Sequence, residues 1–232
     1  AVTHPMMLDY LDQRKSIGPN SRTAQRSSKP LGLNENLARE VMELHTLGVD
    51  GPYTQQDVRQ LAELFTGLSF RFKTGFQFNA NMAEPGPETV LAKEYGNDPA
   101  QLEQIHAVLG DLAVHPATAE HIARKLVVHF VEDSPDPELV DHVAARFRDT
   151  GGDLGQVYAA LLEHPAAWVP ELRNVKPPLD FVASACRALA VYPEKLQGTS
   201  PQNVVRKLIK PMTMMGQKWE HPLGPDGWPE ED

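Results

Sequence analysis

The two-sided segment of residues 33–53 constrains the fold of this chain more than any other stretch. Asn34 is a favourable helix N-cap, because its side-chain oxygen can accept from the unpaired backbone N–H groups of a first turn. Gly48 can adopt the left-handed conformation that stops a helix near Leu47. At about 100° per residue, the side chains between them separate into two arcs, which predicts an amphipathic helix over residues 34–47. The apolar arc holds Leu37, Ala38, Val41, Met42 and Leu44, and the polar arc holds Glu35, Asn36, Arg39, Glu40 and Glu43.

The polar arc has two interpretations. In the first it is a solvated face, on which Glu35–Arg39 and Arg39–Glu43 form ion pairs at i,i+4 spacing, each worth about 0.2–0.5 kcal/mol. In the second it is a cluster of carboxylates and an amide around Arg39 that borders a cleft. His45 falls within the apolar arc, and we expect a core histidine with its hydrogen bonds satisfied, since a lone histidine supplies no metal site.

A second helix is expected directly after this segment. Thr54 begins a near capping box with Asp57 at the third position, and apolar residues then keep helical spacing until Gly67. The connection over residues 50–53 is short. Short connections make neighbouring helices antiparallel or sharply crossed, and we therefore predict an orthogonal, multi-helix, all-α fold for residues 1–232 as a single domain.

Several blocks of this sequence resemble the domain of unknown function 1800 family (DUF1800). NENLARE, ELHTLGVDG, YTQQDV and LFTG occur in that order, and THPMMLDYLD precedes them. EPGPETVL, HPATAEHIARKLVVHF, FRDTGGDLGQVYAALL, KPPLDFVASACRAL and GPDGWP extend the resemblance to most of the chain. The resemblance implies a mainly helical, exported bacterial protein, located in the periplasm or outside the cell. It implies no particular activity.

The chain departs from the family pattern in the block EPGPETVL. Relatives usually have a histidine, an acidic residue and a glycine there, followed by a lysine before an apolar pair. The histidine position is Ala83 and the lysine position is Glu88, whereas Glu84, Pro85 and Gly86 keep the pattern. Any chemistry that depends on that histidine and lysine would be missing here. Relatives also carry a further helical half upstream, so we expect this chain to be the C-terminal part of a longer protein, with that N-terminal half as one candidate partner.

Composition narrows the classes of partner. The net charge of −9 argues against nucleic-acid backbones and anionic membrane surfaces as main partners. No apolar run approaches the ~18 residues of a membrane span, so we expect no integral membrane segment. The single cysteine, Cys186, excludes an internal disulfide. The sequence contains no Gly-rich phosphate loop, CxxC, HExxH or EF-hand pattern, and we predict neither a metal site nor a cofactor.

Residues 12–31 are predicted to be a loop, because they are rich in serine, proline and basic side chains. One interpretation is a flexible surface loop or an interdomain strap. The other is a mobile basic lid over the acidic helix that follows. The lid would use Arg14, Lys15, Arg22, Arg26 and Lys29.

Between residues 68 and 79 the period changes from helical to alternating. Phe70, Phe72, Phe76 and Phe78 alternate with polar residues around Thr74-Gly75, which predicts one small β-hairpin. A lone hairpin needs to lay its aromatic face on the helices, although an aromatic ligand platform is the alternative. Further helices are expected from Pro99, Pro116, Pro137, Leu154, Leu179 and Pro201, and residues 211–232 are expected to form an irregular tail that wraps over the body.

Two hypotheses for function follow. The first is a non-catalytic accessory or binding module for a small molecule or protein, acting through a cleft beside helix 34–47; its ligand-binding candidates are Asn34, Glu35, Asn36, His45 and Glu84. The second is a hydrolase-like or metal-assisted enzyme. In it Glu40 and Glu43 provide acid–base or ligand oxygens, and Arg39 holds an anionic group. The loss of the histidine at Ala83 disfavours the second.

Overall fold

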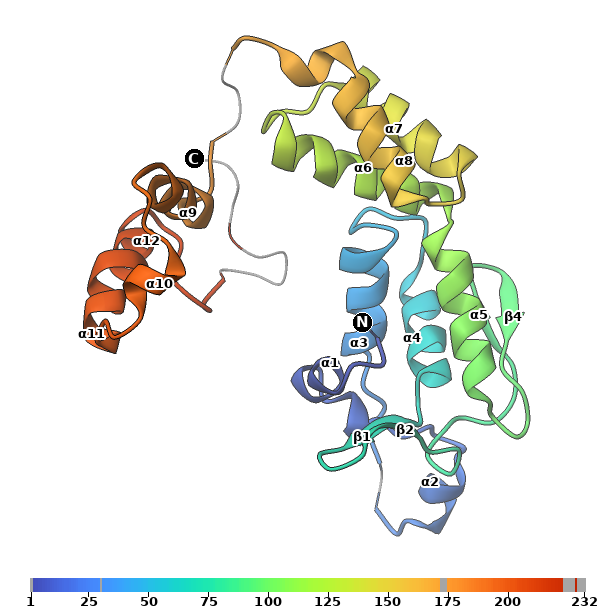
Figure 1. The fold of residues 1–232 in the computed structure, drawn as a ribbon. Helices are drawn as coiled ribbons and strands as arrows, with labels where there is room; N and C mark the ends of the chain where they lie inside the picture. Colours follow the sequence, from blue (N-terminus) through green and yellow to red (C-terminus); the bar gives the residue numbers. More distant parts are fainter. Residues whose placement is uncertain (1, 30, 172–174, 223–227, 229–232) are drawn as a thin grey trace. The chain divides into compact units, whose positions relative to one another are not determined.

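A computed structural model of the protein describes residues 2–29, 31–171, 175–222 and 228. The predicted mainly helical fold is confirmed, and within these residues it is accompanied by two small antiparallel hairpins (Figure 1). The chain divides into two compact units, one of residues 1–123 and 143–158 and the other of residues 124–142 and 159–232. The orthogonal arrangement of the helices and the single domain stay predictions.

The predicted loop over residues 12–31 contains short helices and is tied to the body of the first unit. It follows helix α1 (Pro5–Tyr10) and holds the 3-10 helix η1 (Gln13–Lys15) and helix α2 (Arg22–Arg26). Gln13 is fully buried and its side-chain amide donates to the backbone oxygen of Phe65 over 2.9 Å. Arg14 pairs with Asp9 and Lys15 with Asp12, so these two cations of the predicted lid have partners of their own.

The amphipathic segment forms helix α3 (Asn36–Glu40) and continues as a π turn, η2 (Val41–His45). The N-cap residue of α3 is Glu35, which makes no side-chain cap bond, and not Asn34 as predicted. The Asn34 side-chain oxygen still accepts from the Asn36 backbone N–H, over 2.9 Å, at the first residue of the helix. Gly48 has a φ of +88°, and its N–H donates to the oxygen of Met42 at the end of the segment. Leu37, Ala38, Val41 and Met42 are buried, as their spacing predicts, whereas Leu44 at the end of the predicted apolar arc is only partly buried.

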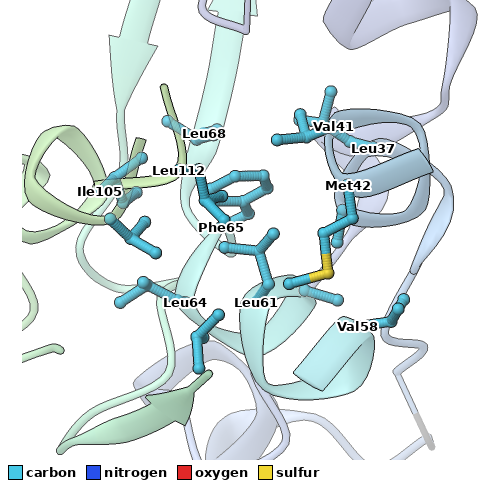
Figure 2. Packing of buried hydrophobic residues seen from close by; sticks show 14 of the residues in the cluster. Leu37, Val41, Met42, Val58, Leu61, Leu64, Phe65, Leu68, Ile105 and Leu112 are labelled. Carbon is cyan, nitrogen blue, oxygen red and sulfur yellow. The ribbon is translucent and has the colours of Figure 1, made fainter. Parts of the chain in front are cut away.

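The predicted capping box opens helix α4 (Gln55–Leu64), in which Thr54 and Asp57 bond each other's backbone N–H groups. Figure 2 shows how α3 and α4 meet: Phe65 lies at the centre, with Met42 of η2 on one side and Leu112 on the other. Burying a side chain of this size is worth about 1.5–3 kcal/mol, so the shared core fixes α4 relative to α3.

The predicted hairpin is formed by β1 (Leu68–Arg71) and β2 (Gly75–Phe78), with Phe70 opposite Phe76 and Ser69 opposite Gln77. Phe70 is buried, whereas Phe72 at the hairpin tip is 85% exposed. The second hairpin, β3 (Glu88–Val90) and β4 (Lys93–Tyr95), lies in a stretch without sequence periodicity and was not predicted.

Helix α5 (Leu102–Ala113) begins later than predicted, with Gln101 rather than Asp98 at its N-cap position. Asp111 on α5 accepts from the hydroxyl of Tyr95 over 2.6 Å and pairs with Lys93, and these contacts hold the second hairpin on the helix.

The later helices follow their predicted starts closely, with a proline or an aspartate near each beginning. Asp136 accepts a backbone N–H bond at the start of the helix over residues 137–149, and Asp153 does so at the start of the helix over residues 154–163. Their bounds are α6 (Pro116–Phe130), α7 (Pro137–Asp149), α8 (Leu154–Glu163), the 3-10 helix η3 (Pro165–Trp168) and α9 (Pro178–Ala188).

The end of the chain is more helical than predicted. It forms α10 (Pro193–Leu196), α11 (Pro201–Val204), the π turn η4 (Val205–Ile209) and α12 (Lys210–Met214). The helix therefore continues into the predicted irregular tail of residues 211–232, much of which lies outside the described residues. Across the described part of the chain, every helix is too short or too polar to cross a membrane.

Candidate functional site

The predicted polar cluster exists on the outer face of α3. Nη1 of Arg39 lies 3.0 Å from a carboxylate oxygen of Glu43, and Nη2 lies 3.5 Å from one of Glu35. Both predicted i,i+4 ion pairs are thus present. The Arg39 side chain is 40% exposed and the Glu43 side chain 24%, so solvent screens the pairs only in part.

Gln55 completes this cluster from the neighbouring helix. Its side-chain oxygen accepts from Nη2 of Arg39 over 2.8 Å, and its amide nitrogen donates to Glu35 over 2.8 Å. Arg39 therefore donates to three side chains of its own chain. An anionic ligand would have to share Arg39 with two carboxylates that already neutralise its charge, which lowers the attraction of this face for a ligand.

Glu40 stands apart from the Arg39 cluster, although the two residues are adjacent on α3. Its side chain is half-buried and has no hydrogen-bond or ion-pair partner among the residues described. Burial raises the pKa of the Glu40 carboxyl, and the neighbouring His45 partly offsets the rise. A carboxyl whose pKa is raised by burial is the kind of group that acid–base sites contain.

The prediction of a buried His45 is wrong, since its side chain is exposed. The physical reason is the π turn of η2, which places one more residue in the turn than an α-helix does. The register is displaced accordingly, and Thr46 and Leu47 are buried in its place. The hydroxyl of Thr46 donates to the oxygen of Val41 over 2.7 Å and holds the widened turn.

The remaining ligand-binding candidates have structural contacts. The side-chain amide of Asn34 donates to the oxygen of Leu11 over 2.9 Å, and its side-chain oxygen accepts from the N–H of Asn36. Glu84 is buried at 8% exposure, and one of its carboxylate oxygens accepts from the backbone N–H of Asn20 over 2.8 Å. The Asn20 side-chain amide donates to the other oxygen. These hydrogen bonds to Glu84 therefore hold the segment before α2 against the rest of the first unit.

A group of buried carboxyls surrounds Glu88, which the sequence marked only as a departure from the family pattern. Glu88 on β3 is 7% exposed and shares a side-chain hydrogen bond with Glu63 on α4. Burial, then the charge and hydrogen bond of Glu63, then the charge of Glu84, raise the pKa of Glu88 to about 8. Glu88 consequently keeps its proton to a higher pH than an ordinary glutamate does.

A polar hollow of about 570 Å³ opens at the first hairpin, which the sequence marked only as a possible aromatic ligand platform. Two phenylalanines and the backbone form part of its wall, and polar side chains form the rest. The lining residues are Ser69, Phe70, Arg71, Gln77, Phe78, Asn79, Ala80 and Asn81. The alternation of polar side chains along both strands is the sequence signal that could have revealed it.

A comparison with models of protein families shows which family the chain belongs to. The family model described as a protein of unknown function, DUF1800, matches residues 1–232. The chain belongs to the DUF1800 family. No curated protein and no solved structure matches it. Family membership brings no reaction with it, so any function for this DUF1800 protein has to be argued from its own side chains.

The structure brings together some of the candidates in this DUF1800 chain and separates others. Glu35, Arg39 and Glu43 form one bonded group, while Glu40 and His45 lie outside it. Glu84 belongs to the buried carboxyl group with Glu88. Within the described ranges, no set of three or more His, Cys, Asp or Glu side chains is placed to hold a metal ion.

Proposed function

We propose that this DUF1800 protein is a non-catalytic binding module that holds a small polar ligand in the hollow beside the first hairpin. The observation that carries the proposal is the hollow itself, about 570 Å³ in volume and walled mainly by polar side chains. A ligand pocket needs a concave surface and a few polar groups that fix orientation, and this one has both.

The contacts around the hollow favour a preformed site. Ser69 and Gln77 are cross-strand partners, so the strand register fixes the spacing between them. Asn79 donates its backbone N–H to Gly67 over 2.8 Å, and its side-chain oxygen accepts from the N–H of Asn81 over 3.2 Å. Because backbone bonds hold these residues, a ligand would meet side chains that need little reordering.

The site proposed here differs from the cleft expected beside helix 34–47. On that helix Arg39 bonds Glu35, Glu43 and Gln55, whereas polar side chains at the hairpin keep open donors and acceptors. A bound ligand therefore gains more at the hairpin, where it does not compete with existing ion pairs.

Amide chemical-shift mapping by NMR tests the proposal. The folded protein is titrated with separate pools of monosaccharides, amino acids and small carboxylic acids, and the shifted amides are assigned. We expect at least one pool to shift residues 69–71 and 77–81 together. Asn79→Ala should abolish these shifts, and Asn97→Ala, at a partly exposed asparagine outside the hollow, should keep them. Shifts confined to residues 34–47 would refute the proposal.

An enzyme remains the second candidate, because the raised pKa of the partnerless Glu40 is the kind of perturbation that acid–base residues show. In this scheme Glu40 exchanges the proton, Arg39 holds an anionic group, and Asn36 orients the substrate. The hydrogen bond of Arg39 to Glu43 weighs against this role of Arg39. Thermal shifts with Mg²⁺, Mn²⁺, Ca²⁺ and Zn²⁺ on the protein and on Glu40→Gln test the metal-assisted form: a stabilisation lost in the variant would favour the enzyme.

We also propose, from the family resemblance, that the protein is exported from a bacterial cell to the periplasm or beyond, with a helical N-terminal half as a partner. Fractionation of cells that express the tagged natural gene tests the location. Recovery in the cytoplasmic fraction alone would contradict it.

A further inference from the structure

The charge of the hollow differs from that of the whole chain. The protein has 31 acidic and 22 basic residues and a net charge of −9. Among the eight residues that line the hollow, Arg71 is the one charged residue, and no carboxylate accompanies it. The hollow is therefore a locally positive spot on an acidic protein, which favours an anionic ligand over a neutral or cationic one.

Among the residues that the structure describes, Arg71 has no carboxylate partner, as is also true of Arg22 and Arg26, whereas other arginines of the first unit have one. Arg14, Arg39 and Arg59 each pair with a carboxylate of the chain. Arg71 is exposed, and throughout the described residues no hydrogen bond or ion pair occupies its guanidinium. Its planar fork of donors is free to bind a carboxylate or a phosphate through two parallel bonds.

The other side chains of the hollow offer a mixture of donors and acceptors. The Asn79 oxygen is used by Asn81, which leaves the Asn79 amide nitrogen free, and Gln77 donates to Thr74 over 3.2 Å, which leaves its side-chain oxygen free. The hydroxyl of Ser69 and the amide of Asn81 add both kinds of group. A ligand with adjacent hydroxyls satisfies such a set, because each hydroxyl both donates and accepts.

A second cationic segment borders the hollow at its Asn81 end. The backbone oxygen of Asn81 accepts from the N–H and the hydroxyl of Thr23, over 2.9 and 2.8 Å. Thr23 lies on α2 between Arg22 and Arg26, both of which are exposed. These cations add to the positive potential around the hollow, and they are part of the basic segment that the sequence suggested as a lid.

We infer that the ligand of the hollow is a hydroxylated anion, a sugar acid or a sugar phosphate, whose charge is bound by Arg71 and whose hydroxyls are bound by Asn79 and Asn81. This inference rests on the proposed function. The shared chemistry of the two sources is an anionic group beside vicinal hydroxyls. A neutral sugar loses the contact with Arg71, and a simple carboxylate loses the contacts with the amides.

Isothermal titration calorimetry at low ionic strength tests the inference with four probes: glucuronate, glucose 6-phosphate, glucose and acetate. We expect at least one anionic sugar to bind about tenfold or more tightly than glucose and than acetate. The stronger of the two anionic sugars identifies the source, carboxylate or phosphate. Affinity should fall as NaCl is raised.

Three variants separate the contribution of Arg71 to ligand affinity from that of the general positive charge around the hollow. Arg71→Ala should reduce the affinity for the anionic sugar to that for glucose, and Arg71→Lys should restore only part of it, because an ammonium cannot bind bidentately. Lys73→Ala removes a nearby exposed cation outside the lining and should leave the affinity within about twofold.

The outcomes distinguish this inference from the proposed function. Equal, Asn79-dependent binding of glucose and glucuronate would overturn the anionic ligand while leaving the binding module intact. Binding of none of the four probes would overturn the inference, and the NMR pools then decide the proposed function separately. Anionic binding that survives in Arg71→Ala but disappears in Lys73→Ala would also overturn it.

Discussion

Nη2 of Arg39 donates to the side-chain oxygen of Gln55 over 2.8 Å, and this contact joins α3 to the first turn of α4. The same Gln55 donates back to Glu35, so the two helices share a closed set of polar contacts above a common apolar core. The densest group of ionisable residues in the sequence is thus explained by the packing of two helices.

Replacement of Arg39 tests this structural role. Arg39→Ala removes two ion pairs and the hydrogen bond to Gln55, and we expect the free energy of unfolding to fall by about 0.5–1.5 kcal/mol. Urea denaturation measures the change, which should shrink in 1 M NaCl because the pairs are partly exposed. Arg124→Ala, an exposed arginine on α6, should change stability by less than about 0.5 kcal/mol. Equal losses in both variants would contradict the structural role.

The carboxyl of Glu88 makes stability depend on pH. Its pKa is raised from an ordinary value of 4.5 to about 8, so between these pH values the folded protein binds one more proton than the unfolded chain. The stabilisation that comes from this extra proton is fully present below pH 4.5. The free energy of unfolding then falls as the pH rises from 4.5 towards 8. The charged groups facing Glu88 are Glu63 and Glu84, and Arg59 pairs with Glu63.

Glu88→Gln isolates this effect. The amide cannot ionise, and we expect the variant to be more stable than the natural protein by about 1 kcal/mol or more at pH 9, with a smaller difference at pH 4. Urea denaturation across this range provides the measurement. Glu94→Gln, an exposed carboxyl on the adjacent strand, should leave the pH profile unchanged. A pH profile of Glu88→Gln parallel to that of the natural protein would show that Glu88 ionises normally.

The sequence predicted elements whose signals are local. The Thr54–Asp57 capping box and the hairpin of alternating phenylalanines each depend on a few neighbouring residues, and both occur in the structure. The failures involve distant partners or altered geometry. His45 is exposed because a π turn changes the period, and a periodicity argument assumes a constant period.

The second hairpin and the buried carboxyls were missed for a related reason. Leu91 and Ala92 form its turn with φ values of +50° and +62°, although neither residue is typical of such turns. The turn is held from outside, by a hydrogen bond of 2.8 Å from the N–H of Leu91 to Asp57 on α4. Likewise the carboxyls around Glu88 come from α4 and from the segment after β2. No spacing in the sequence predicts that residues of these two segments meet. The hollow could have been found only by combining the strand register with the residues that follow it.

Ala92 is expected to be strained, because the left-handed conformation costs a non-glycine residue about 1–2 kcal/mol. Ala92→Gly removes that cost but increases the freedom of the unfolded chain, which leaves an expected net gain of about 0.5–1 kcal/mol. Thermal unfolding should show a raised Tm. The matched change Ala107→Gly, at an exposed position within α5, should lower stability by about 1 kcal/mol. A lowered Tm for Ala92→Gly would show that its turn is not strained in solution.

The contact between Asn20 and Glu84 should control how firmly residues 12–31 are held. Besides this contact, Gly18 donates its N–H to Met82 over 2.9 Å, and Gly18 lies so close to Glu84 that a Cβ there would be 2.5 Å from the Glu84 nitrogen. Asn20→Ala removes one donor to a buried carboxylate, and we expect a loss of about 1.5–3 kcal/mol, concentrated in local opening of this segment.

Limited digestion with trypsin measures that opening, because Arg14, Lys15, Arg22 and Arg26 all lie within the segment. Cleavage there should be at least tenfold faster in Asn20→Ala than in the natural protein, while cleavage in α4 stays unchanged. Asn97→Ala, which removes an exposed contact with Gln101, serves as the control and should be cleaved at the natural rate. If Asn20→Ala accelerates cleavage in α4 as much as in residues 12–31, the contact supports the whole unit and not the segment alone.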